Sequence, residues 1–373
     1  MKHTPSKKII ALGLGLLLAA AAPAATYVAV STANGIDEYV VNGSSWTYDH
    51  PIIYRTGLYG ITYNPADGLL YACDAVVNEV FSIDPTNGTQ TALATLGNNT
   101  PGWTSDNPQN IAFGPDGKLY FSTAFGTPTS QGIFSLNTDG SGFAQFIPQT
   151  GAGWSLGRAR DLAWVGTNLF VTSRYNNNVY EFDGTGALVG TGAINSAAVT
   201  GASSLYADTN NNILYVGSNQ SGVNSIRTLD IGGPLPVAPG SATDSGGKVN
   251  SIGIIKVGGT LFYITFNSGT SSHGAIYRLN ADKTSTVVVA DLGATANDFT
   301  VMGTASTGPL DSVGLQLPRT NMIAGTSQQA IALANYQLIT NDVSTDPGTV
   351  YGSDNTNIVM VSASGKINAV NPG

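Results

Sequence analysis

One short pattern recurs along this chain at a regular interval, and it constrains the fold more than any other feature. In "LFVTSRYNNNVYEFDGTG", residues 169–186, apolar and polar residues alternate on both sides of a run of asparagines, as the two strands of a half-buried hairpin require. The aromatic residue that opens each copy recurs 45 to 50 residues apart, at Tyr71, Tyr120, Phe170, Tyr215 and Phe262. A single hairpin is only marginally stable. The spacing therefore indicates an array of similar sheets packed against one another.

Apolar segments flank each hairpin and supply the other two strands of a four-stranded sheet. Inner strands are expected before the hairpins, at 57–65, 108–115, 160–166, 203–209, 250–257 and 297–303, and outer strands after them. This order predicts an all-β fold, a β-propeller whose blades have four antiparallel strands. Weaker hairpins near Tyr27 and Ile358 favour seven blades, with six or eight as alternatives. Because the first hairpin has no inner strand before it, a segment near the C-terminus is expected to complete the first blade.

The first residues have the pattern of a secretory signal peptide. Three lysines precede an apolar run at 9–22, and small residues follow it. Removal of residues 1–24 would leave 25–373 as a single propeller domain, with a divergent or inserted segment near 303–350. An uncleaved membrane anchor is the alternative, although the apolar run is shorter than the roughly 20 residues that span a bilayer. We therefore expect an exported bacterial protein, periplasmic or extracellular, with no membrane insertion in its mature form.

Charge and cysteine content limit the partners of the chain. It has 15 Lys and Arg against 23 Asp and Glu, a formal net charge of −8. This acidity disfavours nucleic acid and anionic membranes as partners. The only cysteine, Cys73, cannot form an intrachain disulfide, and its place in an alternating strand predicts a small buried hydrophobic residue rather than a reactive thiol. Stability must then come from packed apolar cores.

Several of the repeats are similar to those of known propeller families. The hairpins "LFVTSRYNNNVYEFDGTG" and "LLYACDAVVNEVFSIDPTNG" look like NHL and YVTN repeats. The segment "PQNIAFGPDGKLYFST" resembles a unit of the gluconolactonase-like propellers. The resemblance covers roughly residues 27–293, and it implies an architecture rather than one activity, because these propellers include hydrolases, lyases and binding scaffolds.

The gluconolactonase-like resemblance implies a divalent metal at the channel mouth, held by a Glu, an Asn and an Asp. Asn110, Asp161 and Asp298 stand at the start of inner strands and are the candidate ligands for a cation such as calcium. The Glu is missing, because the glutamates of this chain all lie within hairpins. The chain also resembles the streptogramin-lyase-like propellers, but His50 and His273 lie in unlike sequence contexts and do not match their paired-histidine site.

Two segments that lead into inner strands repeat each other. "GWTSDNPQN" places Trp103 seven residues before Asn110, and "GWSLGRARD" places Trp154 seven residues before Asp161. An aromatic ring beside an amide or carboxylate suits a sugar, which needs an apolar face to stack on and a polar group for its hydroxyls. The alternative, which we favour, is that each tryptophan packs between adjacent blades.

Three cationic or titratable residues are further candidates for ligand binding. Arg158 and Arg160 flank Asp161 and could bind an anionic group, although pairing with a neighbouring aspartate is the commoner role of such an arginine. His273 lies in a hairpin loop and is the one histidine that we would test as a general base, although an ordinary exposed loop residue is the simpler interpretation.

The sequence is consistent with three functions. The favoured one is an exported, non-enzymatic propeller without a cofactor, whose loop-rich face binds a glycan, peptide or protein partner. The second is a metal-dependent, lactonase-like hydrolase with the cation at Asn110, Asp161 and Asp298. The third is a structural component of a cell surface or fibre, suggested by the low charge and the abundance of Thr, Asn and Gly. No residue is assigned a catalytic role.

Overall fold

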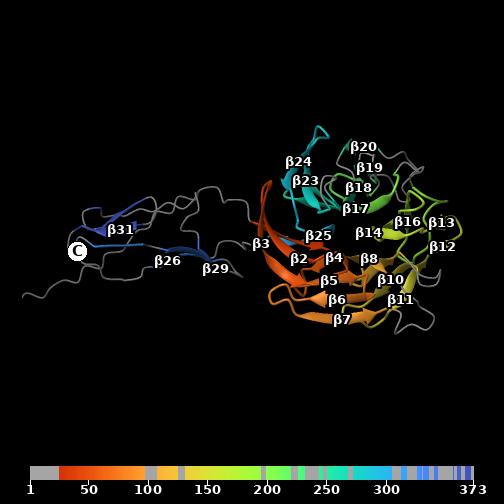
Figure 1. Ribbon diagram of the computed structural model, residues 1–373, viewed down its shortest axis with the longest axis horizontal. Coiled ribbons are helices and arrows are strands. Elements are labelled where there is room, and N and C mark those ends of the chain that lie inside the picture. The colour runs from red at the N-terminus through yellow and green to blue at the C-terminus, as the bar shows by residue number, and fades with distance from the viewer. Residues whose placement is uncertain are drawn as a thin grey trace, which may run out of the picture. The chain divides into compact units, whose positions relative to one another are not determined.

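In a computed structural model of the chain, six antiparallel sheets, five of four strands and one of three, are arranged around a central axis (Figure 1). The described residues are 25–96, 107–124, 131–194, 199–219, 226–231, 243–246, 250–267, 272–304, 312–316, 326–329, 331–335, 340–342, 356, 359–362 and 366–370. The predicted signal peptide, and Trp103, lie outside them. The chain divides into two units, one spanning Ala25–Gly303 and the other including Thr304–Gly373, and each is described by itself.

Blades 1 to 3 each contain four antiparallel strands. From the axis outward, blade 1 consists of β25 (Ala296–Thr304), β1 (Thr26–Thr32), β2 (Gly35–Asn42) and β3 (Ser45–Tyr54). Blade 2 consists of β4 (Leu58–Asn64), β5 (Leu69–Asp74), β6 (Glu79–Ile83) and β7 (Gln90–Thr95). Blade 3 consists of β8 (Pro108–Phe113), β9 (Leu119–Thr123), β10 (Gly132–Leu136) and β11 (Ala144–Pro148).

Blades 4 to 6 follow the same order. Blade 4 consists of β14 (Ala159–Val165), β15 (Asn168–Ser173) and β16 (Asn178–Phe182), with a bridge from Phe182 to Leu188 at its outer edge. The small hairpin of β12 (Thr150–Gly151) and β13 (Trp154–Ser155) precedes it. Blade 5 consists of β17 (Ala202–Asp208), β18 (Ile213–Ser218), β19 (Ile226–Asp230) and β20 (Thr243–Gly246). Blade 6 consists of β21 (Ser251–Val257), β22 (Thr260–Thr265), β23 (Ala275–Leu279) and β24 (Ser285–Val289).

The number of blades is six, the lower end of the expected range, rather than the favoured seven. The segment expected as the inner strand of a seventh blade, 297–303, lies in β25 and is the inner strand of blade 1. It therefore supplies the closing strand that was expected near the C-terminus. The hairpin at the end of the chain does form, as β30 (Val359–Val361) and β31 (Lys366–Ala369), but it pairs with β27 (Ser327–Gln329) in the second unit.

The second unit contains a further small sheet. Strands β26 (Ser312–Gln316), β28 (Ile331–Asn335) and β29 (Thr340–Asp342) form it in that order. A divergent or inserted segment of the propeller domain was expected near 303–350; in the structure β25 is the last strand of the propeller, and these later strands belong to the other unit. Among the described residues, no segment forms a helix with the length and apolar character needed to cross a membrane.

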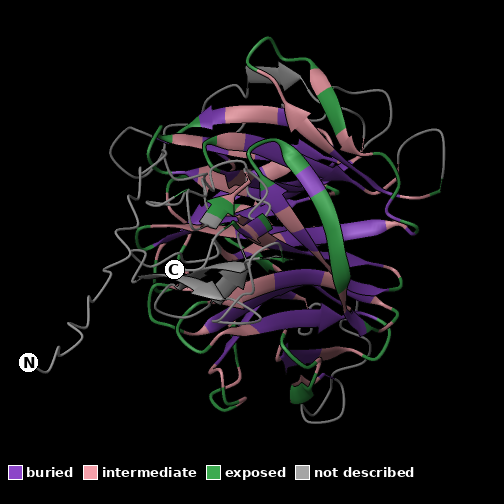
Figure 2. Cartoon of the chain, turned by 90° about the vertical axis from the view of Figure 1, so that its left-hand side faces the viewer, coloured by how far each residue is buried: buried purple, intermediate pink, exposed green. Residues whose placement is uncertain are grey.

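The core of the propeller consists of six apolar clusters, one at each boundary between neighbouring blades. Both faces of a sheet pack against neighbouring blades, so residues on both faces of the second and third strands are buried, as in β9, β10 and β15 (Figure 2). The cluster between blades 6 and 1 includes Phe262, Trp46 and Phe299, and thereby spans the ring closure. Cys73 is buried at the boundary between blades 2 and 3, as predicted.

Asparagine residues fix the hairpin loops and also tie them to the next blade. Asn78 and Asn177 adopt left-handed backbone conformations, with φ of 55° and 57°, which asparagine tolerates better than most residues. The side chain of Asn78 accepts a hydrogen bond from the amide of Asn107, and that of Asn177 accepts one from Gly201. Both acceptors therefore hold the segment that leads into the following inner strand.

Candidate functional site

In blades 2 to 6 the register of pairing shifts near the start of the inner strand, as a β-bulge produces. Two residues are skipped there in blades 2 to 4, and one residue in blades 5 and 6. We call the two residues at this position the bulge pairs; in blades 2 to 6 they are Tyr59–Gly60, Gln109–Asn110, Arg160–Asp161, Ser203–Ser204 and Ile252–Gly253, and we count with them Asn297–Asp298, which stands at the equivalent position of blade 1. The sequence-predicted residues Asn110, Arg160, Asp161 and Asp298 all fall within them.

Asp161 ties blade 4 to both of its neighbours. Its Oδ1 accepts hydrogen bonds from the Asn110 side chain of blade 3 at 2.7 Å and from the Leu162 amide at 2.7 Å. Its Oδ2 accepts one from the Leu205 amide of blade 5 at 2.6 Å. The bulge frees these amides from the regular ladder, and the buried carboxylate satisfies them.

Asp298 and Asn110 repeat the same arrangement at other blade boundaries. Asp298 accepts hydrogen bonds from the amide of Phe299 at 2.9 Å and from that of Ile61, in blade 2, at 3.1 Å. Asn110 accepts one from its own neighbour, Ile111, at 2.6 Å, while its amide group donates to Asp161. The second residue of each of these bulge pairs therefore links one inner strand to the next.

The first residues of the bulge pairs in blades 2 to 4 contact one another. The guanidinium group of Arg160, in blade 4, donates a hydrogen bond to Gln109 of blade 3 and lies 5.0 Å from the ring centroid of Tyr59 in blade 2. A side chain that reaches two blades away on the inner side of the ring extends into the central channel. The side-chain amide of Asn297 donates to the Leu58 carbonyl at 2.6 Å, and its Oδ1 has no hydrogen-bond partner among the described residues.

Burial dominates the electrostatics of the channel. It raises the pKa of Asp161 to about 7 and lowers that of Arg160 to about 10, because both charged groups are removed from water. The pKa of Asp298 is also raised by burial and, secondarily, by the charge of Asp161. Since blades 1 and 4 are opposite one another in a ring of six, the two carboxyl groups belong to opposite walls of the channel.

The raised pKa of Asp161 predicts that the protein becomes less stable as the pH rises from about 4 to about 7. In this window the folded protein retains a proton that the unfolded chain, with an ordinary pKa near 3.8, has already lost. Urea unfolding between pH 4.5 and pH 8 should therefore show a declining free energy of unfolding, and Asp161→Asn should show a smaller decline. Asp291→Asn, at an exposed carboxyl, is the control. An identical pH dependence in wild type and Asp161→Asn would contradict the assignment.

The donors in the channel do not fit a shared cation. The side-chain oxygens of Asn110, Asp161 and Asp298 already accept amide hydrogen bonds, and Asp161 and Asp298 direct an oxygen to different blade boundaries, toward Leu205 and Ile61. A calcium ion needs six to eight oxygens at 2.3–2.6 Å. The geometry brings Asn110 and Asp161 together but directs Asp298 to another boundary. A cation held by all three residues therefore stays a prediction without geometric support.

The other predicted residues have partners of their own. Trp154 packs edge-on against Phe182, with ring centroids 5.6 Å apart, and belongs to the cluster between blades 3 and 4, which agrees with the packing interpretation. The guanidinium group of Arg158 donates to the Tyr175 hydroxyl at 3.2 Å. His273 Nδ1 lies 2.8 Å from Asp291 Oδ1, and both side chains are exposed.

Sequence reasoning missed Tyr59 and Gln109, which complete the contacts of Arg160. Gln109 stands one position before Asn110, which the sequence analysis named, and Tyr59 lies within the inner strand that was expected at 57–65. Superposing the inner strands on their apolar residues would have placed both in the channel. They escaped notice because a tyrosine or glutamine at the start of a strand is usually read as an ordinary surface or packing residue.

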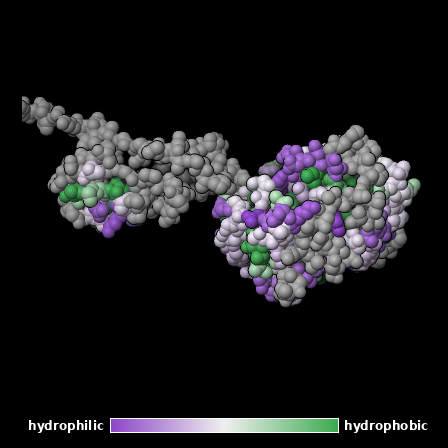
Figure 3. Space-filling model, turned by 90° about the horizontal axis from the view of Figure 1, so that it is seen from above, coloured by the Kyte–Doolittle hydropathy of each residue, from purple (hydrophilic) through white to green (hydrophobic). Residues whose placement is uncertain are grey.

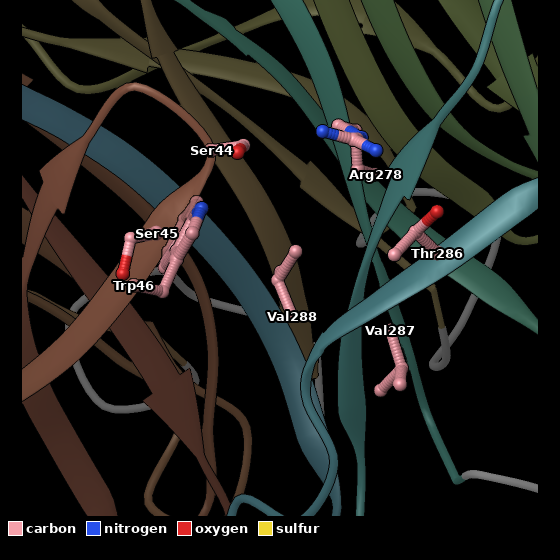
Figure 4. A pocket seen from close by; sticks show the side chains of 7 residues that line it. All are labelled: Ser44, Ser45, Trp46, Arg278, Thr286, Val287 and Val288. Carbon is pink, nitrogen blue, oxygen red and sulfur yellow. The ribbon is translucent and has the colours of Figure 1, made fainter.

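A pocket with a volume of about 410 Å³ lies where the outer strands of blades 6 and 1 meet. Ser44, Ser45 and Trp46 contribute from the β2–β3 turn and β3, and Arg278, Thr286, Val287 and Val288 contribute from β23 and β24 (Figure 4). The Trp46 indole nitrogen is buried and has no hydrogen-bond acceptor among the described residues. This pocket is at the ends of the strands opposite to the hairpin loops, because β3 begins where β2 ends.

Comparisons with known proteins identify the fold. No protein-family model and no curated protein matches the chain in sequence. The crystal structure of a nidogen/laminin complex contains a similar chain, with a TM-score of 0.59, 13% identity, and 74% of this chain and 98% of that chain covered. A gluconolactonase from Xanthomonas campestris is similar with a TM-score of 0.51 and 14% identity, over 75% of this chain and 91% of that one.

A protein of unknown function from Bacteroides caccae is similar to the same extent. Its TM-score is 0.51 at 11% identity, with 74% of this chain and 98% of that chain covered. Identities this low show the fold alone. The resemblance seen in the repeats is thus confirmed at that level, and the chain is a six-bladed β-propeller distantly similar to the NHL and gluconolactonase-like propellers.

Proposed function

We propose that this protein is an exported, non-enzymatic binding propeller that holds a peptide or protein partner on its hairpin-loop face. We define this face by the loops between the second and third strands of each blade and by the segments that lead into the inner strands. The observation that supports the proposal is a group of exposed apolar side chains on this face. Tyr54 is 81% exposed, Val76 70% and Val77 53%.

These exposed side chains are held by a rigid polar clamp. Arg55 donates to Asp74 at 2.6 Å and to Glu79 at 2.5 Å, and its guanidinium group lies 3.9 Å from the Phe81 ring centroid. The other oxygen of Asp74 accepts hydrogen bonds from the amides of Val76 and Val77, at 2.9 and 3.1 Å. A loop fixed in this way loses little conformational entropy on binding.

The propeller surface seen in Figure 3 is mostly polar where it is described. Hydrophilic and weakly polar residues cover most of the described propeller surface in the view of Figure 3, with small, separate hydrophobic patches. Exposed apolar side chains that cluster on one face are typical of interaction sites, whereas single ones are common on any surface. The clamp therefore distinguishes the Val76–Val77 loop from exposed residues on other faces, such as Val287.

We expect peptides selected from a phage-displayed library against the purified protein to depend on the loop. The double variant Val76→Ser, Val77→Ser should weaken such a peptide by at least about tenfold, because interface anchors often contribute 2 kcal/mol or more. Val287→Ser, at a half-exposed valine of blade 6, is the control and should leave binding unchanged. Selected peptides that bind the double variant as tightly as they bind Val287→Ser would contradict the proposed face. Binding to an oligosaccharide array, with no peptide selected, would contradict the proposed partner.

A lactonase-like hydrolase is the second candidate, and the pKa of Asp161, about 7, is the observation that favours it. A general base works best with a pKa near the working pH. The test is acid release from gluconolactone in a pH-stat, with and without added calcium or a chelator, for wild type and Asp161→Asn. Hydrolysis that is lost in this variant would favour the enzyme over the binding propeller.

A further inference from the structure

The outer two strands of blade 1 are joined across an irregular stretch of pairing. Asp37 lies opposite Pro51 and Tyr39 lies opposite Tyr48, so that Glu38 on β2 faces two residues of β3. Two residues opposite one define a β-bulge. Successive side chains of a regular strand point to opposite faces. At this bulge, in contrast, Asp49 and His50 both approach Glu38.

The donor atoms of these three side chains are spaced as the ligands of one metal ion are. His50 Nδ1 lies 3.0 Å from Asp49 Oδ2 and 3.8 Å from Glu38 Oε1, and the three donor atoms lie within 4.8 Å of one another. Zinc binds imidazole nitrogen and carboxylate oxygen at about 2.0–2.2 Å. Two ligands of one ion are therefore at most about 4.4 Å apart, and both measured separations satisfy this limit.

The burial of the three side chains also suits an ion. The Glu38 side chain is 12% exposed, and those of Asp49 and His50 are each 49% exposed, so one ligand is anchored in the blade and the site is open to solvent. A divalent cation between the Glu38 and Asp49 carboxyl groups would also balance their like negative charges.

We propose that Glu38, Asp49 and His50 together bind one divalent transition-metal ion, with water at its remaining positions. The imidazole ligand favours zinc and its neighbours in the first transition row over calcium and magnesium, which prefer oxygen ligands alone. Within the described part of the chain, no other three His, Cys, Asp or Glu side chains bring their donor atoms this close together. The histidine separates this group from an ordinary patch of surface acids.

A second exposed histidine provides a matched control for the site. His273 Nδ1 lies 2.8 Å from Asp291 Oδ1, about as close as His50 lies to Asp49, but among the described residues no third His, Cys, Asp or Glu brings a donor atom within ligand distance of this pair. If a carboxylate beside an exposed histidine were enough to hold zinc, both places would bind it. If three ligands are needed, only the site on blade 1 will bind zinc.

The test is calorimetric titration of the purified full-length protein with ZnCl₂, together with its melting temperature in the same salt. We expect wild type and His273→Ala to bind one zinc ion with equal affinity and to melt at a higher temperature with zinc, because the ion binds only the folded state. His50→Ala and the nearly isosteric Glu38→Gln should weaken binding by at least about tenfold. The visible absorption of bound Co²⁺ gives a second readout of imidazole ligation.

Three outcomes would overturn the proposal. The first is equal zinc binding by wild type, His50→Ala and Glu38→Gln, which would mean adventitious binding to the surface. The second is a loss of binding in His273→Ala as large as that in His50→Ala. The third is a preference for CaCl₂ over ZnCl₂ that does not depend on His50. Cooperative melting of each variant without metal shows that it is folded; His50 lies on the edge strand β3, and Glu38→Gln on β2 preserves the shape of the side chain.

Discussion

Replacing Asp161 with alanine is expected to lower the free energy of unfolding by about 3 to 6 kcal/mol at pH 7. The change removes the acceptor of three hydrogen bonds, from the amides of Leu162 and Leu205 and from the side chain of Asn110. Each buried donor left without a partner costs about 1–3 kcal/mol. The buried guanidinium group of Arg160 also loses a nearby opposite charge, which adds to the loss.

Urea unfolding followed by tryptophan fluorescence measures this effect, and Asp183 offers a matched control. Its carboxylate also accepts three hydrogen bonds, two from Thr185 and one from the Ala187 amide, but it lies in an exposed turn. Water can replace an exposed acceptor, so Asp183→Ala should cost less than about 1 kcal/mol. An equal loss in the free energy of unfolding for Asp161→Ala and Asp183→Ala would contradict the stability that we assign to the buried hydrogen bonds of Asp161 between blades.

Replacing Phe299 with alanine is expected to cost about 3–5 kcal/mol, as large-to-small substitutions of buried aromatic residues do. Phe299 lies on β25, is 3% exposed and packs in the cluster between blades 6 and 1, with its ring 6.1 Å from that of Trp46. The substitution leaves a cavity at the boundary where the ring closes. It therefore weakens the boundary that joins the two ends of the propeller chain.

The same unfolding measurement tests this effect, with Tyr54→Ala as the control. Tyr54 is also aromatic but is 81% exposed, so its truncation should change the free energy of unfolding by less than about 0.5 kcal/mol. A loss below about 1 kcal/mol for Phe299→Ala would indicate that the closing strand contributes little to the stability of the ring.

The sequence predicted the architecture well because alternation and spacing are local properties. The hairpins that open at Tyr71 and Phe170 lie in blades, and their inner strands fall where the apolar segments placed them. The blade count was harder to predict. The segment 297–303 has the pattern of an inner strand, but nothing local shows that it pairs with β1, so it was counted as a blade of its own. The hairpin at the end of the chain was also counted as a blade, because nothing local shows that it pairs with β27 in the second unit.

The channel was predicted only in part. Asn110 and Asp161 were expected together, and they are joined by a hydrogen bond. The residue types did not reveal that the carboxylate oxygens are directed to backbone amides, because the bulges that expose those amides leave no trace in the hydrophobic pattern. The bulge that joins Glu38 to Asp49 and His50 is equally invisible in the sequence, where Glu38 is distant from the other two residues.

The order of strands in blade 1 has a consequence for biosynthesis. The strands β1 to β3 are the first part of the propeller to be translated, and β25, which lies innermost in the same sheet, is the last. A ribosome makes the chain from its N-terminus. The outer three strands of this sheet therefore have no innermost strand to pair with until residue 304 has been added. The closed ring therefore forms only after the whole propeller sequence has been translated, whatever the other blades do earlier.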